Sequence, residues 1–243
     1  LHGRVLAGRP ELLVVSDGSD EAALAAALGE SLGAFTGPGG APARLAIDGG
    51  GEQLREGWIT STQVNFCAAA WPAVSPAHPD AAAFAVLGHF LRDGFLHRAI
   101  REQGGAYGGG ASYDADSASF RFYSYRDPRL AETVADFRRS LDWLQGQHPA
   151  ERVEEAILGV VRDLDQPRSP AGEAVRAHYN ALFGRTPGFR RELRSRVLAV
   201  TLADLQRVAE RYLQPAAGHV AVIGARQSLE EAAGELDLSL RVL

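Results

Sequence analysis

Residues 101–110 read Arg-Glu-Gln-Gly-Gly-Ala-Tyr-Gly-Gly-Gly and separate two segments of different periodicity. Before them, apolar side chains recur every three or four positions, which predicts a long helix over about residues 83–100. After them, residues 120–125 are rich in the aromatic side chains that favour strands. The glycines allow a sharp turn and a close approach to another surface. We therefore expect Arg101 and Tyr107 on the two sides of a helix-to-strand hinge, an arrangement that a simple connection does not need.

The segments on either side of this hinge predict an α+β domain. Alternation over residues 58–70 predicts a strand, and Asp127-Pro128 fits the cap and first position of a helix. Residues 219–224 predict a last strand. Further helices are expected near residues 130–144, 153–164, 171–183, 188–197, 202–213 (capped by Thr201) and 228–236. This order favours an antiparallel sheet with helices packed on one face.

The N-terminal region resembles the C-terminal end in its order of elements. Residues 12–15 predict a strand and residues 21–32 a helix, followed by a linker over residues 36–42. We expect residues 1–48 to be the tail of a preceding similar domain with its linker, and residues 57–243 to be a complete domain. The alternative is chance, because strand–turn–helix units are common. The first residue is leucine, so we expect a fragment of a longer chain.

Composition limits the classes of function. The 243 residues are 46% hydrophobic without a long apolar run, which argues against a membrane span. A net charge of −5 and the lack of a basic stripe argue against nucleic acid. The single cysteine, Cys67, excludes an internal disulfide and is expected to be buried. Because no signal peptide is visible, a cytoplasmic location is favoured.

Most catalytic motifs are absent from the sequence. Neither His-Glu-x-x-His nor its inverse occurs, and His148 to Arg152 fits a plain helix start. His89, Asp93 and His97 share helical spacing, but nothing nearby completes a metal site. The glycine run follows a helix, the reverse of a phosphate loop. No Gly-x-Ser-x-Gly nucleophile motif occurs either. We expect this chain to bind no catalytic metal.

Arg101 and Tyr107 remain as candidates for chemistry. An arginine presents a planar fork of donors to a carboxylate or peptide carbonyl. A tyrosine hydroxyl can donate to an oxyanion that develops on a carbonyl. The alternative is structural: an arginine at a helix C-terminus and a tyrosine packed on a sheet.

Residues 101–109, with Phe122 to Pro128 and the segment 59–66, resemble the C-terminal half of presequence-protease-like enzymes. These are zinc metallopeptidases of the pitrilysin/insulinase family, and the resemblance extends over residues 57–215. It implies two halves, each with two domains of the mitochondrial-processing-peptidase type, that enclose peptide substrates.

The resemblance also implies which catalytic roles belong to this chain and which to the N-terminal half of the same protein. Zinc would be bound by the N-terminal half of the same protein, so the isolated chain would be inactive. Arg101 and Tyr107 would hold the substrate and support the polarised carbonyl, with Gly104 and Gly105 beside the substrate. The alternatives are a non-catalytic partner or core subunit of this family, and an unrelated α+β binding module.

Overall fold

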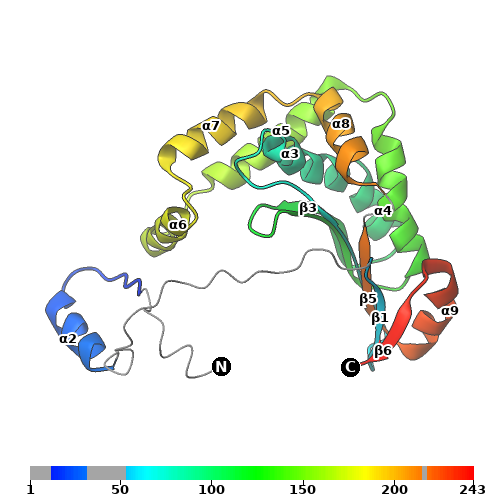
Figure 1. Cartoon of the computed structure of the whole chain (residues 1–243), viewed down its shortest axis with the longest axis horizontal. Helices are drawn as coiled ribbons and strands as arrows, with labels where there is room; N and C mark the ends of the chain where they lie inside the picture. The colour runs from blue at the N-terminus through cyan, green and yellow to red at the C-terminus, as the bar shows by residue number, and fades with distance from the viewer. Residues whose placement is uncertain (1–11, 32–52, 215–217) are drawn as a thin grey trace. The chain divides into compact units, whose positions relative to one another are not determined.

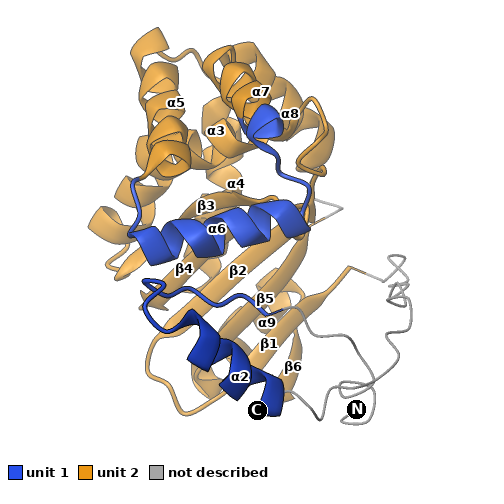
Figure 2. Ribbon diagram, turned by 90° about the vertical axis from the view of Figure 1, so that its left-hand side faces the viewer, with its two compact units in different colours: residues 1–50, 167–190 blue, residues 51–166, 191–243 orange. Residues whose placement is uncertain are grey.

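The computed structural model describes residues 12–31, 53–214 and 218–243. The chain divides into two compact units, residues 1–50 with 167–190 and residues 51–166 with 191–243 (Figure 2).

The first unit contributes two helices to the described residues, α2 (Glu21–Ser31) and α6 (Pro170–Leu182). Pro170 and the Ser169 hydroxyl, which accepts from the backbone N–H of Gly172, begin α6 as expected for a cap. The predicted helix near the N-terminus is confirmed. The predicted strand over residues 12–15 is wrong, because these residues have no regular secondary structure and pair with none of the strands in the described ranges. The predicted linker at residues 36–42 lies outside the described residues, and the predicted domain boundaries stay a prediction.

The second unit is built on a six-stranded sheet with the order β3-β4-β2-β5-β1-β6 (Figure 1). Neighbours from β3 to β5 are antiparallel, whereas β1 pairs in parallel with β5 and with β6. The strands are β1 (Arg55–Ile59), β2 (Asn65–Pro72), β3 (Gly108–Asp114), β4 (Ser119–Asp127), β5 (His219–Gly224) and β6 (Ser239–Val242). The predicted α+β class is confirmed.

The single strand predicted over residues 58–70 is two strands. The chain leaves the sheet between Ile59 and Asn65, and β5 lies between β1 and β2. Burial alternates along β2 but not along β1, so the alternation in the sequence identified β2 and gave no signal for the crossing.

The helices of the second unit pack on one face of the sheet (Figure 1). Ring contacts link Trp71 of β2 to Phe122 of β4, Phe122 to Phe137 of α4, and Phe120 to Phe84 of α3, at centroid distances of 5.5, 5.5 and 5.7 Å. These side chains form the centre of the core. The helices are α3 (Ala81–Leu91), η2 (Arg92–Gln103), α4 (Ala131–Leu144), α5 (Ala150–Asp165), α7 (Pro187–Leu198, which begins in the first unit), α8 (Leu202–Tyr212) and α9 (Arg226–Leu236).

The long helix before the hinge changes its winding at Arg92. It is an α-helix to Leu91 and then a π-helix, η2, to Gln103. The wider turn is visible in the contact between His97 Nδ1 and the Glu102 carboxylate, five positions apart, at 3.4 Å. The predicted helix is confirmed, but its second half, which leads to Arg101, is wound as a π-helix and not as the predicted α-helix. The π-helix is rare, and the single-turn π-bulges in which it mostly occurs are frequent at functional sites.

Two predicted caps have different outcomes. Thr201 and Asp204 form the reciprocal capping box of α8, as the sequence predicts. The prediction that Asp127 and Pro128 begin a helix is wrong, because α4 begins at Ala131. Instead, the Asp127 carboxylate accepts from the backbone N–H of Arg129 and closes the turn ahead of α4. None of the helices in the described ranges is long and apolar enough to cross a bilayer.

Candidate functional site

Backbone hydrogen bonds close the hinge between η2 and β3. The N–H groups of Gly105 and Ala106 donate to the carbonyls of Arg101 and Ile100, each at 3.1 Å. The N–H of Tyr107 donates to the carbonyl of Arg126 at 3.3 Å. Because the last carbonyls of a helix have no partner within the helix, this turn also satisfies the end of η2. We call residues 101–107 the Arg–Tyr turn.

The two glycines of the Arg–Tyr turn are needed for different reasons. Gly105 has φ +78°, which favours glycine, and it is exposed. Gly104 has φ −84°, which any residue adopts, but it is buried. A Cβ on Gly104 would overlap the Arg129 guanidinium and would lie 2.5 Å from the Ile100 carbonyl oxygen. Gly105 therefore supplies a backbone conformation, and Gly104 supplies space.

The Arg101 side chain is exposed in the last turn of η2. The described part of the chain gives its guanidinium no hydrogen-bond or ion-pair partner. Its neighbour Glu102, by contrast, pairs with His97. The Arg101 fork can thus bind an external carboxylate or carbonyl.

Tyr107 is 63% exposed, yet its ring is held on two sides. Its centroid lies 5.6 Å from that of Tyr125, and the Arg126 guanidinium carbon lies 5.8 Å from the same centroid. Arg126 has φ +50°, and the register between β2 and β4 shifts next to it, between Asn65 and Cys67. Such irregularities redirect side chains near functional sites. The phenol of Tyr107 is oriented but open to a ligand.

The ring of Tyr125 places this site relative to the sheet. Along β4 the side chains of Phe120, Phe122 and Ser124 are buried toward the helices, and the exposed Tyr125 lies on the opposite side. Tyr107 contacts Tyr125 on that second face. The Arg–Tyr turn therefore presents its phenol away from the helices of the second unit.

Sequence reasoning assigned no role to Tyr125, Arg126 or Arg129. Tyr125 and Arg126 contact Tyr107 from β4, and Arg129 lies against Gly104 from the loop after it. Tyr125 and Arg126 were already part of the family resemblance, but their support of the turn depends on the pairing of β3 with β4 and on the hydrogen bond from Tyr107 to Arg126.

The histidines of the long helix do not form a metal site. His89 Nε2 lies 3.1 Å from Asp163, and its Nδ1 lies 2.8 Å from the Arg92 guanidinium. Burial, together with the charge of Arg92, lowers the pKa of His89, although Asp163 acts in the opposite direction. In the ranges that the structure describes, no three His, Cys, Asp or Glu side chains converge as metal ligands. The donor set of these residues does not fit zinc.

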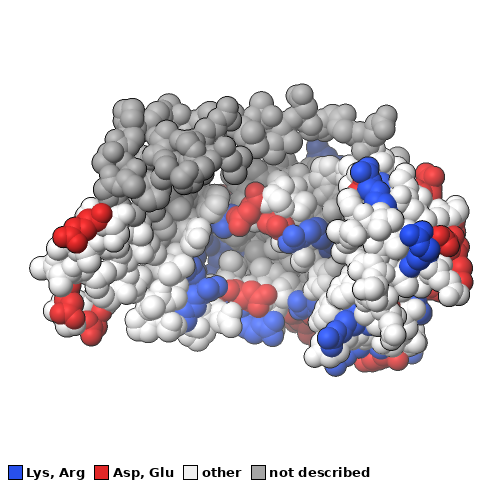
Figure 3. Space-filling model, turned by 90° about the horizontal axis from the view of Figure 1, so that it is seen from below, with Lys and Arg blue, Asp and Glu red and all other residues white. Residues whose placement is uncertain are grey.

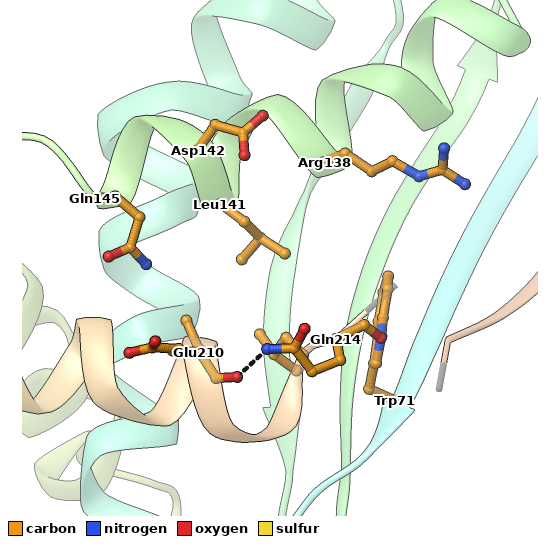
Figure 4. Close-up of a pocket in the computed structure, with 9 residues that line it drawn as sticks. Trp71, Arg138, Leu141, Asp142, Gln145, Glu210 and Gln214 are labelled. Carbon is orange, nitrogen blue, oxygen red and sulfur yellow. Dashed lines mark hydrogen bonds between the residues drawn. The ribbon is translucent and has the colours of Figure 1, made fainter. Parts of the chain in front are cut away.

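A cavity of about 520 Å³ lies between α4 and α8, with Trp71 at its sheet end (Figure 4). It contains charges of both signs, including Arg138, Asp142 and Glu210. Trp71 pairs with Phe120 in the sheet, toward the end of β4 opposite to Tyr125. This cavity is therefore separate from the Arg–Tyr turn.

Acidic and basic side chains of the described residues are interspersed on the face shown in Figure 3. That face carries no broad stripe of one sign, in keeping with the modest net charge of −5. Such a surface lacks the electrostatic pattern of a nucleic-acid interface.

The fold is similar to that of solved proteins of the M16 class. The solved structure of pitrilysin has a TM-score of 0.61 and 15% identity and covers 91% of this chain, which covers 24% of pitrilysin. The M16 inactive domain from Pseudomonas fluorescens has a TM-score of 0.59 and 16% identity, with 84% of this chain and 50% of that one covered.

The sequence itself specifies the family. Residues 55–224 match the family described as the PreP C-terminal domain, and the chain belongs to this family. The suspected relation to presequence proteases is confirmed.

Named relatives support this membership. The mitochondrial presequence protease of Saccharomyces cerevisiae is 38% identical over 164 residues, and that of Kluyveromyces lactis is 36% identical over 165 residues. Each alignment covers 67% of this chain but only 16% of the relative. The chain therefore spans a small part of their length. Because these relatives are named as mitochondrial, the expectation of a cytoplasmic location is wrong.

Proposed function

We propose that this chain is the substrate-binding, metal-free part of a zinc metalloendopeptidase that degrades peptides in a closed chamber. The observation that carries the proposal is the Arg–Tyr turn, in which a guanidinium without a partner in the described residues and an oriented, exposed phenol follow one another. Family membership supports peptide hydrolysis as the activity of the full-length protein.

In this proposal, Arg101 holds a carbonyl or carboxylate of the peptide through its fork of N–H donors. The Tyr107 hydroxyl donates to the carbonyl oxygen at the scissile bond as negative charge develops there. Gly105, exposed in the turn, lets the peptide approach the backbone. Gly104 is buried, so its contribution to substrate binding is the shape of the turn.

The zinc ion would be bound by the N-terminal half of the full-length protein. The described residues of this chain do not have the donor set for it. We therefore expect the purified chain to be inactive alone and to need the N-terminal half as its partner. The domain boundaries at residues 48 and 57 belong to the same proposal.

The test is substitution of Arg101 and Tyr107 in the full-length protein. Removal of one oxyanion donor typically lowers kcat by about 10² to 10³. We expect Tyr107→Phe and Arg101→Ala to lower turnover of a fluorogenic peptide by about 100-fold without a change in the thermal midpoint. The matched control is Arg98→Ala, an exposed arginine of the same helix. Normal turnover in either variant would refute the proposed role of the substituted residue, whereas a full-length protein without peptidase activity would favour the alternative of a non-catalytic subunit.

A further inference from the structure

We propose that Arg129 is a positioning residue that holds the Arg–Tyr turn in its working geometry. This inference rests on the proposed function of that turn. It concerns a side chain that contacts neither the phenol nor the exposed guanidinium, but the backbone beneath them.

Arg129 is bound to the end of η2. Its Nη2 donates to the carbonyl of Ala99 at 3.1 Å, two residues before Arg101. The next two carbonyls, of Ile100 and Arg101, accept from Ala106 and Gly105 within the turn. Of the three carbonyls at residues 99–101, that of Ala99 is therefore the one bound by a side chain from outside the turn, Arg129.

Arg129 is itself held firmly. The same Nη2 lies 3.1 Å from the buried carboxylate of Asp136 on α4. Its backbone N–H donates to Asp127, whose second oxygen accepts from the Thr133 hydroxyl at 2.8 Å. Its carbonyl accepts from the Asn65 amide at 3.3 Å. Asp136 thus holds the guanidinium, while Asp127 and Asn65 hold the backbone of Arg129, and Asp127, Asp136 and Asn65 are all buried.

Gly104 is the counterpart of Arg129 in the turn. A Cβ at this position would overlap both Nη2 and Cζ of Arg129. The guanidinium can reach the end of the helix only because residue 104 has no side chain. The contact of Gly104 with Arg129 thus determines the position of the last turn of η2, which carries Arg101.

The consequence for catalysis follows from the other end of the turn. The backbone N–H of Tyr107 donates a hydrogen bond to the carbonyl of Arg126, which lies three residues before Arg129. The segment 126–129 therefore holds Tyr107 at one end and the helix that carries Arg101 at the other. Arg129 sets the distance between the two groups, and misplacement of a reacting group by about 1 Å can cost about 100-fold in rate.

The experiment uses the full-length protein with Arg129→Gln, Arg129→Lys and, as the matched control, Arg139→Gln. Arg139 also pairs with Asp136, but the contacts with the Ala99 carbonyl and with Gly104 are made by Arg129 and not by Arg139. We expect Arg129→Gln to lower kcat for a fluorogenic peptide by about 10- to 100-fold with less effect on KM. Arg129→Lys, which keeps the charge near Asp136, should retain more activity, and Arg139→Gln should stay within about twofold of wild type.

A double-mutant cycle distinguishes positioning from a general structural role. If Arg129 acts by placing Arg101, then Arg129→Gln lowers kcat much less in an Arg101→Ala background than in the wild type. Independent losses that multiply, an equal loss in Arg139→Gln, or wild-type kcat in folded Arg129→Gln and Arg129→Lys would each overturn the inference. Wild-type kcat in Arg101→Ala itself would instead refute the proposed function.

Discussion

The ring of Tyr107 packs on the ring of Tyr125, with centroids 5.6 Å apart and planes at 55°. Tyr125 lies in strand β4 and pairs with Gly108 of β3, whereas Tyr107 lies in the turn that precedes β3. The strand thereby limits the orientations of an exposed phenol, and in the proposed function this reduces the entropy that Tyr107 would lose when a peptide binds.

Loss of this ring contact is expected to reduce turnover. Aromatic pairs contribute about 0.5–1.5 kcal/mol beyond burial, so Tyr125→Ala should lower kcat of the full-length protein by a few-fold to about tenfold. Tyr125→Phe keeps the ring and is the matched control, for which we expect a kcat within about twofold of wild type. Equal kcat values for the two variants would show that Tyr125 does not orient Tyr107.

Gly105→Ala should destabilise the chain. A left-handed backbone costs a residue with a Cβ about 1–2 kcal/mol, and Gly105 has φ +78°. A Cβ added to Gly234, in helix α9, would meet no atom within 4 Å, so Gly234→Ala should stabilise by up to about 1 kcal/mol. Urea unfolding of both variants measures this, and the prediction is wrong if the two changes have the same sign.

His89 should make stability depend on pH. Burial first, and Arg92 second, lower the pKa of His89 from its ordinary value of 6.5, against the opposing effect of Asp163 and Asp93. The unfolded state then binds more protons in this range, so the free energy of unfolding falls as the pH decreases through about 6.5 toward the folded-state pKa.

The variant His89→Gln isolates this contribution. Denaturant titrations between about pH 7.5 and pH 5.5 should give a smaller loss of stability for His89→Gln than for wild type. An unchanged slope would mean that the histidine does not titrate differently in the folded state.

Cys67 should be unreactive until the fold opens. It is 1% exposed, and burial raises the pKa of its thiol to about 12. Because the thiolate is the reactive form, a thiol reagent at about pH 8 should not label the native chain but should label it stoichiometrically in denaturant. Rapid labelling of the folded chain would contradict the buried position that the sequence already predicted.

The fold followed from local patterns more readily than the site did. Alternation and helical spacing predicted β4, α5, α8 and β5 because each buries one face. The strand β3 was missed because its first three residues are glycines, which carry no pattern. The π-helix was missed because Arg92 to Gln103 still shows an apolar face.

The residues of the candidate site also differed in how far the sequence could predict them. Arg101 and Tyr107 could be selected from their chemistry and from the family resemblance. Their supports, Tyr125 and Arg129, come from a strand and a loop whose register with the turn depends on tertiary pairing. The contact of Gly104 with Arg129 is a tertiary contact that no local sequence pattern predicts.

Strand β3, which follows the turn, lies at one edge of the sheet, and β4 is its one strand partner among the described residues. A rearrangement of the turn around an incoming peptide would therefore disturb one ladder of hydrogen bonds and leave the other five strands paired. Amide hydrogen exchange should be faster in Gly108 to Gly110 than in β2, which has a partner on each side. The edge position of β3 therefore lets the end of the sheet that carries the Arg–Tyr turn deform more easily than its centre.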